Sequence, residues 1–289
     1  MLSSHPSSAS ILLSCPDQRG LISSIADFFS DRKISLKRCE VYNVDDQIFL
    51  RCEWVQNSNW ENEQDFAGEF TPLAEKLAAW YSVRFLNQSQ SVGLIVSSQE
   101  QVLAEILAKS TTDFFPPMEI VFIIGDDENL QQIADRHAVP FFFIPAPSCS
   151  NQETLQHERQ QLEIIRRYQP SCVGLAKYAK VLSANFLQKA DCPVLTVEHL
   201  FTNTSGAEPY DQAYKNGAKL VGATCNFATA EPGLGSIIEQ DVRRIPTAAT
   251  LPEIVQLSYA VEQSVFATGL QKVLWHKVIT HHNRTIVFA

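Results

Sequence analysis

One acidic side chain stands directly before a histidine at the end of an apolar segment. Glu198 and His199 follow residues 194–197, a run that is typical of a buried strand. A carboxylate and an imidazole can orient a water molecule and move its protons, which is the chemistry of acid–base hydrolysis. Side chains alternate along a strand, so adjacent residues point to opposite sides of it. The pair therefore has a catalytic and a structural interpretation.

Other patterns that could do chemistry have simpler explanations. Gly233 and Gly235 form only a fragment of a phosphate-binding loop and precede a predicted strand. The adjacent His281 and His282 would diverge on a helix, so we expect a solvated helix end and no metal site. We expect reduced cysteines that pack as small hydrophobic residues, because the chain has no Cys-x-x-Cys spacing among its cysteines at 15, 39, 52, 149, 172, 192 and 225.

Composition excludes several classes of protein. The chain has 289 residues, 45% of them hydrophobic and 19% charged, with a formal net charge of −9. This mixture is globular rather than disordered, and the length suggests one large or two smaller domains. A general nucleic-acid binder needs a cationic surface, which the negative charge argues against. Without a long apolar run or a basic leader, we expect a cytoplasmic protein with no membrane contact.

Residues 8–87 have the pattern of a small α/β domain. Residues 16–20 form a turn that leads into a helix beginning at Leu21, and a second helix contains Phe66 and Phe70. Asp45 and Asp46 separate two strand-like runs, which predicts a hairpin. The predicted order is βαββαβ, the ferredoxin-like pattern, with strands over residues 9–14, 34–44, 47–55 and 82–86.

Residues 91–289, which follow a polar linker over residues 87–91, have a different sequence pattern. Unbroken apolar strands alternate with helices, which predicts a doubly wound, mostly parallel α/β sheet covered on both faces. The predicted strands span residues 92–96, 119–124, 140–144, 172–176 and 194–197. Ligands collect at the carboxyl ends of such strands, so we expect the site near residues 198–209.

Several longer segments carry a family resemblance. They span residues 15–22, 168–170, 175–182, 206–214, 222–224, 237–241 and 283–288. In this order and spacing, the chain resembles the formyltetrahydrofolate deformylases, hydrolases that convert 10-formyltetrahydrofolate and water into tetrahydrofolate and formate. The resemblance implies an ACT domain over residues 8–87 and a formyltransferase-like α/β domain over residues 91–289.

The family's catalytic positions are substituted in this chain. The family uses Asn-x-His at a strand end and an Asp in a later loop, and the matching positions here are Thr196, Glu198 and Gly233. The reaction needs a donor beside the developing oxyanion and a group that delivers a proton. Glycine has no functional group, and an ionised glutamate repels an oxyanion. His199 matches a second histidine that follows the catalytic one in deformylases.

The resemblance also implies binding positions. Folate would contact Lys180, Val181 and Leu182 and a second group formed by Asn226, Thr229 and Gly233. An amino-acid effector of the ACT domain would contact Asp17, Gln18, Gly20 and Leu21, although a plain strand-to-helix turn explains these residues equally well. ACT domains commonly pair through their sheets, so the resemblance implies a homodimer or homotetramer.

Three functions remain open from the sequence. The first is a paralogue that binds a folate or another small ligand, catalyses little or no deformylation and has a regulatory role. The second is a working deformylase, or a hydrolase of an altered formyl or acyl substrate, that uses Glu198 and His199. The third is a sensing module that acts through the ACT domain. None of them requires a metal ion or a resident cofactor.

Overall fold

The computed structural model describes residues 8–56, 60–97, 100–147, 151–176, 178, 182–200, 209–231 and 233–289. Its contacts divide the chain into two compact units. The first unit contains the chain up to Ser89 together with Lys272–His281 and Ile286–Ala289. The second contains Gln90–Gln271 and His282–Thr285. The last residues of the chain therefore return to the first unit.

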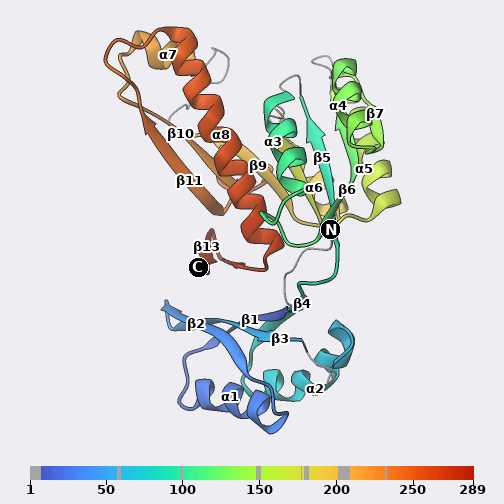
Figure 1. Cartoon of the computed structure of the whole chain (residues 1–289), viewed down its shortest axis with the longest axis vertical. Helices are drawn as coiled ribbons and strands as arrows, with labels where there is room; N and C mark the ends of the chain where they lie inside the picture. Colours follow the sequence, from blue (N-terminus) through green and yellow to red (C-terminus); the bar gives the residue numbers. More distant parts are fainter. Residues whose placement is uncertain are drawn as a thin grey trace. The chain divides into compact units, whose positions relative to one another are not determined.

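The first unit has the βαββαβ order that the sequence predicts (Figure 1). Its antiparallel sheet has the strand order β2-β3-β1-β4. Asp45 and Asp46 turn the β2–β3 hairpin with positive φ angles of 52° and 60°, a backbone conformation that Asp tolerates better than most residues. The elements are β1 (Ser8–Pro16), α1 (Leu21–Asp31), β2 (Leu36–Val44), β3 (Gln47–Val55), α2 (Glu63–Lys76) and β4 (Trp80–Phe85).

Both faces of this sheet are covered. On one face, aromatic side chains of α1 and α2 pack against β3, with Phe29 and Trp54 in contact at 5.0 Å between ring centroids. The residues on the other face include Leu12 and Phe49, which pack with Ile286 and Phe288 from the end of the chain. The predicted helix end at His281–His282 is wrong, because His281 ends strand β12 (Val278–His281) and His282 turns toward β13 (Arg284–Val287).

The second unit is built on a seven-stranded sheet in the order β11-β10-β9-β8-β5-β6-β7. Strands β5 to β9 are parallel, as the apolar runs predict. β10 pairs antiparallel with β9, and β11 pairs antiparallel with β10. The strands are β5 (Gln90–Val96), β6 (Met118–Gly125), β7 (Phe141–Phe143), β8 (Cys172–Ala176), β9 (Val194–His199), β10 (Leu220–Phe227) and β11 (Ile237–Arg244).

Helices cover both faces of this sheet. α8 crosses one face, where Phe266 packs against Gly174 of β8, since a Cβ on that glycine would lie 2.8 Å from the ring (Figure 1). Leu162 and Ile165 of α5 pack with Val173 and Leu175 of β8. The helices are α3 (Glu100–Ser110), the 3₁₀ turn η1 (Glu128–Leu130), α4 (Gln131–Arg136), α5 (Asn151–Tyr168), α6 (Ala184–Lys189), α7 (Pro209–Lys215) and α8 (Leu251–Leu274).

Local hydrogen bonds fix the residue at which α8 begins. Thr250 precedes its first turn, and the Glu253 carboxylate accepts hydrogen bonds from the Thr250 backbone N–H and hydroxyl at 2.7 and 2.8 Å. Pro252 lies in the first turn, where its missing N–H costs no helical hydrogen bond. This Thr-x-x-Glu arrangement is a capping box that fixes where the helix begins. None of the described helices is both long and apolar enough to cross a bilayer.

Candidate functional site

Strand β9 places its polar residues on two sides of the sheet. Thr196 and Glu198 are two residues apart and share one face, whereas His199 points to the other. Antiparallel pairing sets Thr196 opposite Asn226 and Glu198 opposite Thr224 of β10. The structure therefore separates Glu198 from His199, as strand alternation predicts, and brings Thr196 beside Asn226.

The Glu198 carboxylate joins β9 to β10 and to the loop before β11. It accepts hydrogen bonds from the Asn226 side-chain amide and from the backbone N–H of Gly233. Burial raises the pKa of Glu198, while the two hydrogen bonds and the nearby His199 oppose that rise. Glu198 is thus an acceptor for two donors of the protein itself.

Asn226 is the most enclosed of these residues, with 3% of its surface exposed. Its Nδ2 donates to Glu198, and its Oδ1 has no hydrogen-bond partner among the described residues. Gly235 passes so close that a Cβ there would lie 2.8 Å from Asn226 Nδ2 and 1.9 Å from the backbone oxygen of Phe227. A glycine at position 235 therefore allows the loop to pass over Asn226.

His199 belongs to a second polar group on the other face. Its Nδ1 lies 2.9 Å from Oε1 of Glu262 on α8, and the Tyr210 hydroxyl donates to the same oxygen at 2.8 Å. The His199 and Tyr210 rings also meet edge to face, with 5.0 Å between centroids. The Glu262 side chain is 2% exposed, so α8 and α7 hold this imidazole against a buried carboxylate.

The sequence analysis named neither Glu262 nor Tyr210. The Thr250-x-x-Glu253 capping box was a readable signal for α8, and it would have placed Glu262 within an apolar helix that also carries Val261 and Val265. An acidic residue in such a stripe indicates a buried partner. Tyr210 has no comparable signal, because its role depends on a contact between two distant segments.

The remaining predicted folate positions are only partly described. Lys180 and Val181 lie outside the described residues, and Leu182 is buried in the core beneath α5. The exposed Thr229 donates its hydroxyl to the backbone oxygen of Glu231 at 2.6 Å, which tightens the loop that leads to Gly233. Gly233 has a φ of 77° and open space where a Cβ would stand.

A buried polar cluster lies next to these positions. Glu158 of α5 is 3% exposed and accepts hydrogen bonds from the Ser183 backbone N–H at 2.7 Å and from its hydroxyl at 2.6 Å. Ser183 in turn caps α6 through the backbone N–H of Phe186. Close by, the Gln161 amide donates to the Tyr178 hydroxyl at 3.3 Å, and burial raises the pKa of Tyr178 to about 12. This cluster fixes the start of α6 at the carboxyl end of β8.

The predicted effector residues have structural partners in the first unit. The Gln18 amide donates to the backbone oxygen of Leu77 at 2.8 Å, and Asp17 accepts from the Asn43 side chain at 2.9 Å. Gly20 caps α1 with a φ of 83°, and Leu21 is buried in the core. These contacts match the strand-to-helix turn, and the Asp17 side chain is exposed to solvent.

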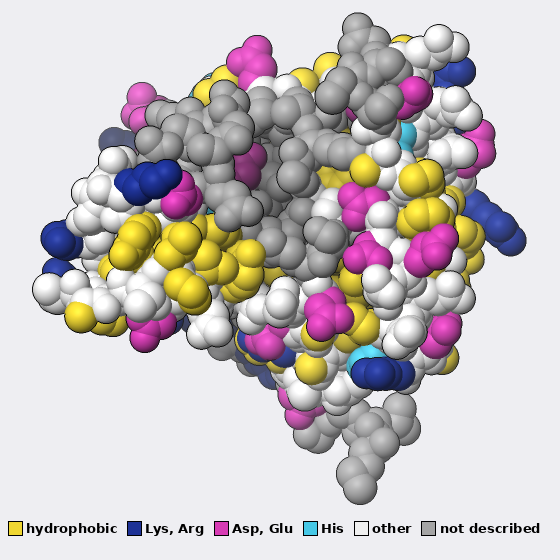
Figure 2. Space-filling model, turned by 90° about the horizontal axis from the view of Figure 1, so that it is seen from above, with side chains coloured by type: hydrophobic (Ala, Val, Ile, Leu, Met, Phe, Trp, Pro, Cys, Tyr) yellow, Lys and Arg dark blue, Asp and Glu magenta, His cyan; other side chains and the backbone are white. Residues whose placement is uncertain are grey.

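The surface around the second unit's strand ends is not strongly cationic. Figure 2 looks onto this end and shows acidic side chains spread over the described surface, with Lys and Arg mainly at its margin. Within the described part of the chain, no three His, Cys, Asp or Glu residues come together as they would around a metal ion. A groove elsewhere, at the opposite sheet edge from Glu198, is lined by β7, by Ile144 that follows it and by α5 residues.

The arrangement therefore offers two separate polar sites. On one face, the Glu198 carboxylate and the buried Oδ1 of Asn226 are the acceptors, and Oδ1 has no hydrogen-bond partner among the described residues. On the other, His199 is paired with Glu262. The face of Glu198 is suited to binding N–H donors, and it lacks a described imidazole that could transfer a proton beside it.

Comparison with known proteins gives consistent matches. The formyl transferase family model matches residues 91–270. The formyltetrahydrofolate deformylase of Synechocystis is 30% identical over 284 residues, which cover 97% of this chain and 98% of the relative. The deformylase of Bacillus subtilis is 29% identical and covers 96% of this chain and 93% of its own length.

Solved structures show the same architecture. The crystal structure of a formyltetrahydrofolate deformylase from Pseudomonas syringae superimposes with a TM-score of 0.92 at 25% identity. The match covers 99% of this chain and 96% of that one. Both units thus have counterparts in one known polypeptide.

Proposed function

Because the chain belongs to the formyltetrahydrofolate deformylase family, we propose that it binds a folate or a related small ligand and catalyses little or no deformylation. The observation that carries this proposal is that the Glu198 carboxylate is hydrogen-bonded to other groups of the protein. The carboxylate accepts hydrogen bonds from the Asn226 side-chain amide and from the backbone N–H of Gly233. Donors committed to a carboxylate of the protein are not free to stabilise the oxyanion of a formyl group.

The other substituted positions support the same proposal. The relatives are named for a hydrolysis that needs water activation and proton transfer. Thr196 is buried and offers only a short hydroxyl, and Gly233 offers a backbone N–H that Glu198 already uses. His199 is the nearby imidazole, but it faces Glu262 on the other side of β9. Proton transfer would have to come from Glu198 itself.

Ligand binding is supported by the same residues. Asn226 Oδ1 is buried without a described partner, and a buried acceptor of this kind is costly unless a donor reaches it. The pterin ring of a folate carries an amino group and a ring N–H, which are donors of the required type. We therefore propose that a folate donates to the acceptors of this face, and the contacts at Lys180, Val181, Leu182 and Thr229 stay predictions.

The proposal includes a regulatory role for the first unit. We assign residues 8–87 as an ACT domain and residues 91–289 as the formyltransferase-like domain, with Lys272–His281 and Ile286–Ala289 completing the packing of the first. Asp17, Gln18, Gly20 and Leu21 would receive an amino-acid effector. Supporting this, the exposed Asp17 carboxylate stands at the entrance of α1.

We also propose a cytoplasmic homo-oligomer, a dimer or a tetramer. Its support is the hydrophobic exposure along β11, the edge strand of the large sheet, where Ile237 is 45% and Val242 38% exposed. Light scattering coupled to gel filtration checks it. A monomer at micromolar concentration would overturn this part of the proposal and leave ligand binding unaffected.

Titration calorimetry with tetrahydrofolate, combined with an assay of formate release from 10-formyltetrahydrofolate, tests the proposed function. We expect binding without formate release, and weaker binding by Asn226→Asp, which changes the charge and removes the Nδ2 donor to Glu198. Tyr214→Phe, at a side chain that is 49% exposed and is not a predicted folate contact, is the control. Absence of binding to any folate would contradict the ligand, and rapid formate release would contradict the inactive site.

The alternative is a slow hydrolase that uses Glu198 and His199. The raised pKa of Glu198 favours it, because a carboxyl that holds its proton more tightly than usual is better suited to act as an acid. This alternative predicts formate release that falls in both Glu198→Gln and His199→Ala while the fold is kept. Activity that is unchanged in both variants would exclude it.

A further inference from the structure

Two cysteines of the first unit lie side by side across the β2–β3 hairpin. Cys39 and Cys52 are direct partners in the strand register, and their sulfur atoms are 2.9 Å apart, with the Cys52 thiol donating to Cys39. A disulfide has sulfur atoms about 2.05 Å apart and joins residues whose Cα atoms are about 4.4–6.8 Å apart, a spacing that paired antiparallel residues already have. A shift of less than 1 Å between the two sulfurs would bond them.

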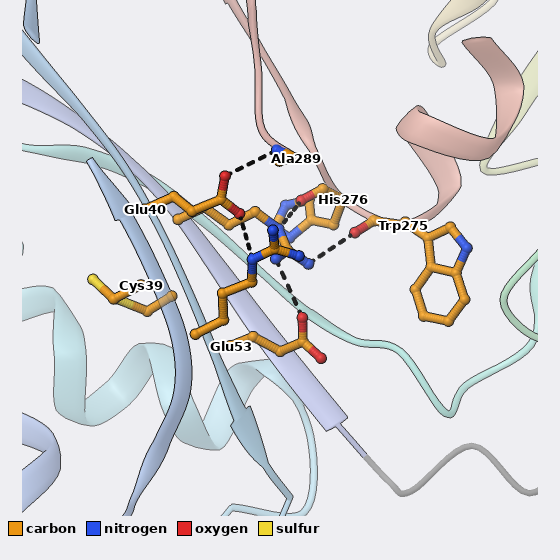
Figure 3. A network of polar contacts seen from close by, with 9 residues as sticks. Cys39, Glu40, Glu53, Trp275, His276 and Ala289 are labelled. Atoms are coloured by element: carbon orange, nitrogen blue, oxygen red, sulfur yellow. Dashed lines mark hydrogen bonds and ion pairs between the residues drawn. The ribbon is translucent and has the colours of Figure 1, made fainter. Parts of the chain in front are cut away.

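The two cysteines differ in accessibility. Cys39 is exposed on β2, which is the edge strand of its sheet, and Cys52 is fully buried in the core beneath α1 and α2. Figure 3 shows the Cys39 side chain pointing away from the polar network that Glu40, Glu53 and the end of the chain form around Arg51. Reagents in solution therefore reach Cys39 and not Cys52.

The hydrogen bond between the thiols also distinguishes them chemically. It lowers the pKa of Cys39, because the Cys52 S–H stabilises the Cys39 thiolate, and it raises the pKa of Cys52 together with burial. The thiolate is the reactive form of cysteine. An exposed cysteine with stabilised thiolate beside a second thiol is the arrangement of peroxide-sensing pairs.

We propose that Cys39 and Cys52 form a reversible redox site in which Cys39 is the peroxide-reactive cysteine and Cys52 the resolving cysteine. The Cys39 sulfur attacks one oxygen of hydrogen peroxide, the O–O bond breaks, and the released hydroxide leaves as water after taking a proton, which gives a sulfenic acid. The Cys52 sulfur then attacks the Cys39 sulfur, the S–O bond breaks, and the hydroxide takes the Cys52 proton as a second water. Two thiols are oxidised to one disulfide, and one peroxide is reduced to two waters.

Other described cysteines lack this combination. Cys15, Cys172 and Cys225 are buried, so reagents in solution do not reach them. Cys192 is partly exposed, but burial raises its pKa to about 11. Cys192 is therefore an internal control, because its thiol is partly exposed but its pKa is not lowered.

Peptide mapping tests the proposal directly, because trypsin cuts after Arg38, Arg51 and Lys76 and so separates the two cysteines. The reduced full-length chain is treated with hydrogen peroxide, blocked with N-ethylmaleimide and digested without reductant. We expect peptides 39–51 and 52–76 to be recovered as one disulfide-linked species that reductant separates. Each of these peptides contains a single cysteine, so the link has only one assignment.

Variants separate the two roles. In Cys52→Ser, we expect no linked species and a sulfenic acid on Cys39 that dimedone traps, whereas Cys192→Ser should leave the link unchanged. In the unmodified chain, N-ethylmaleimide should label Cys39 at least about tenfold faster than Cys192, because each pKa unit between two thiols changes the thiolate fraction about tenfold.

Two results would overturn the proposal, and both come from the unmodified chain, so they do not depend on how the variants fold. One is recovery of both peptides with alkylated thiols after peroxide treatment. The other is a Cys39–Cys39 link between two chains.

Discussion

Glu198 stands where the family resemblance predicts an imidazole, and its surroundings have a measurable consequence. Burial raises its pKa, so the folded chain holds the proton of Glu198 more tightly than the unfolded chain does. The stabilisation from this proton is complete below the unfolded pKa of about 4.3 and is lost as pH rises through the higher folded pKa. Ionisation of Glu198 therefore destabilises the second unit toward neutral pH.

Glu198→Gln should remove this dependence, because a glutamine keeps an acceptor for Asn226 or Gly233 and does not ionise. We expect the melting temperature of the variant to rise relative to the unmodified chain as pH increases from 4.5 toward 7, measured by scanning calorimetry. Glu253→Gln is a control of opposite sign, since hydrogen bonds from Thr250 lower the pKa of Glu253. Its melting temperature should instead fall relative to the unmodified chain as pH rises toward about 4.5 from below, because a lowered carboxyl pKa changes stability only below the unfolded value of about 4.3. Melting temperatures that change with pH in the same way in all three proteins would contradict these assignments.

Tyr210 is the second residue whose role can be measured. Its hydroxyl donates to the buried Glu262, which also faces His199. Tyr210→Phe should cost about 1 kcal/mol of unfolding free energy, the usual contribution of one buried hydrogen bond. Tyr214→Phe on the same helix removes the hydroxyl of a side chain that is 49% exposed and should change nothing. Equal stabilities of the two variants in urea titrations would show that the Glu262 contact contributes little.

Among the elements, the loop between β10 and β11 has the tightest packing at the site. A Cβ at position 235 would collide with the Phe227 backbone oxygen and with Asn226, and backbone atoms cannot rotate away. We expect Gly235→Ala to cost about 3 kcal/mol or more and to disturb the Asn226–Glu198 contact. Gly217→Ala has open space and only a strained φ of 61°, so it should cost about 1 kcal/mol. Thermal unfolding of both variants provides the comparison.

Element prediction from the sequence succeeded where the pattern was local. Asp45 and Asp46 predicted the hairpin, and a turn centred between them pairs residues whose numbers sum to 91, including Cys39 with Cys52. The cysteine pair was therefore readable in the sequence, but scattered spacing along the chain concealed it. Strand β10 was not predicted, because its polar residues Thr224 and Asn226 interrupt the apolar pattern. A strand after Gly235 was predicted, but its antiparallel place beside β10 was not.

Prediction of the site also succeeded only where the pattern was local in the sequence. Alternation along β9 correctly predicted that Glu198 and His199 diverge. The partners of each residue come from α8, α7 and the loop at Gly233, and these contacts depend on tertiary packing that a single sequence does not encode locally. For this reason, the substituted positions stay a prediction from the sequence, and the hydrogen bonds of Glu198 were not predicted.

At the scale of the whole molecule, the end of the chain completes the first unit. His276 is buried there between the hydroxyls of Ser10 and Ser82, at 2.9 and 3.2 Å. Burial and the charges of Arg84 and Arg51 lower the pKa of His276 well below its usual value, so it stays neutral in the folded protein. Arg51, itself 1% exposed, holds the same segment through the backbone oxygens of Trp275 and His276.

This burial predicts acid sensitivity of the first unit. As pH falls below about 6.5, the unfolded chain binds a proton at His276 that the folded chain does not, so stability should fall by up to about 1.4 kcal/mol per pH unit. All four tryptophans lie in the first unit, at 54, 60, 80 and 275, so tryptophan fluorescence in urea reports on it selectively. His276→Asn should flatten the dependence, and the exposed His282→Asn should not. An unchanged slope in His276→Asn would contradict the assignment.

The central claim is that a deformylase architecture is present while its catalytic positions are occupied by Thr196, a hydrogen-bonded Glu198 and Gly233. The most direct measurement is the rate of formate release from 10-formyltetrahydrofolate, compared under identical conditions with the Synechocystis relative. Loss of one oxyanion donor alone costs about a hundredfold in rate, so we expect this chain to be slower by at least that factor. A rate within about tenfold of the relative would contradict the claim, because it would require a catalytic group that Glu198 and its neighbours do not supply.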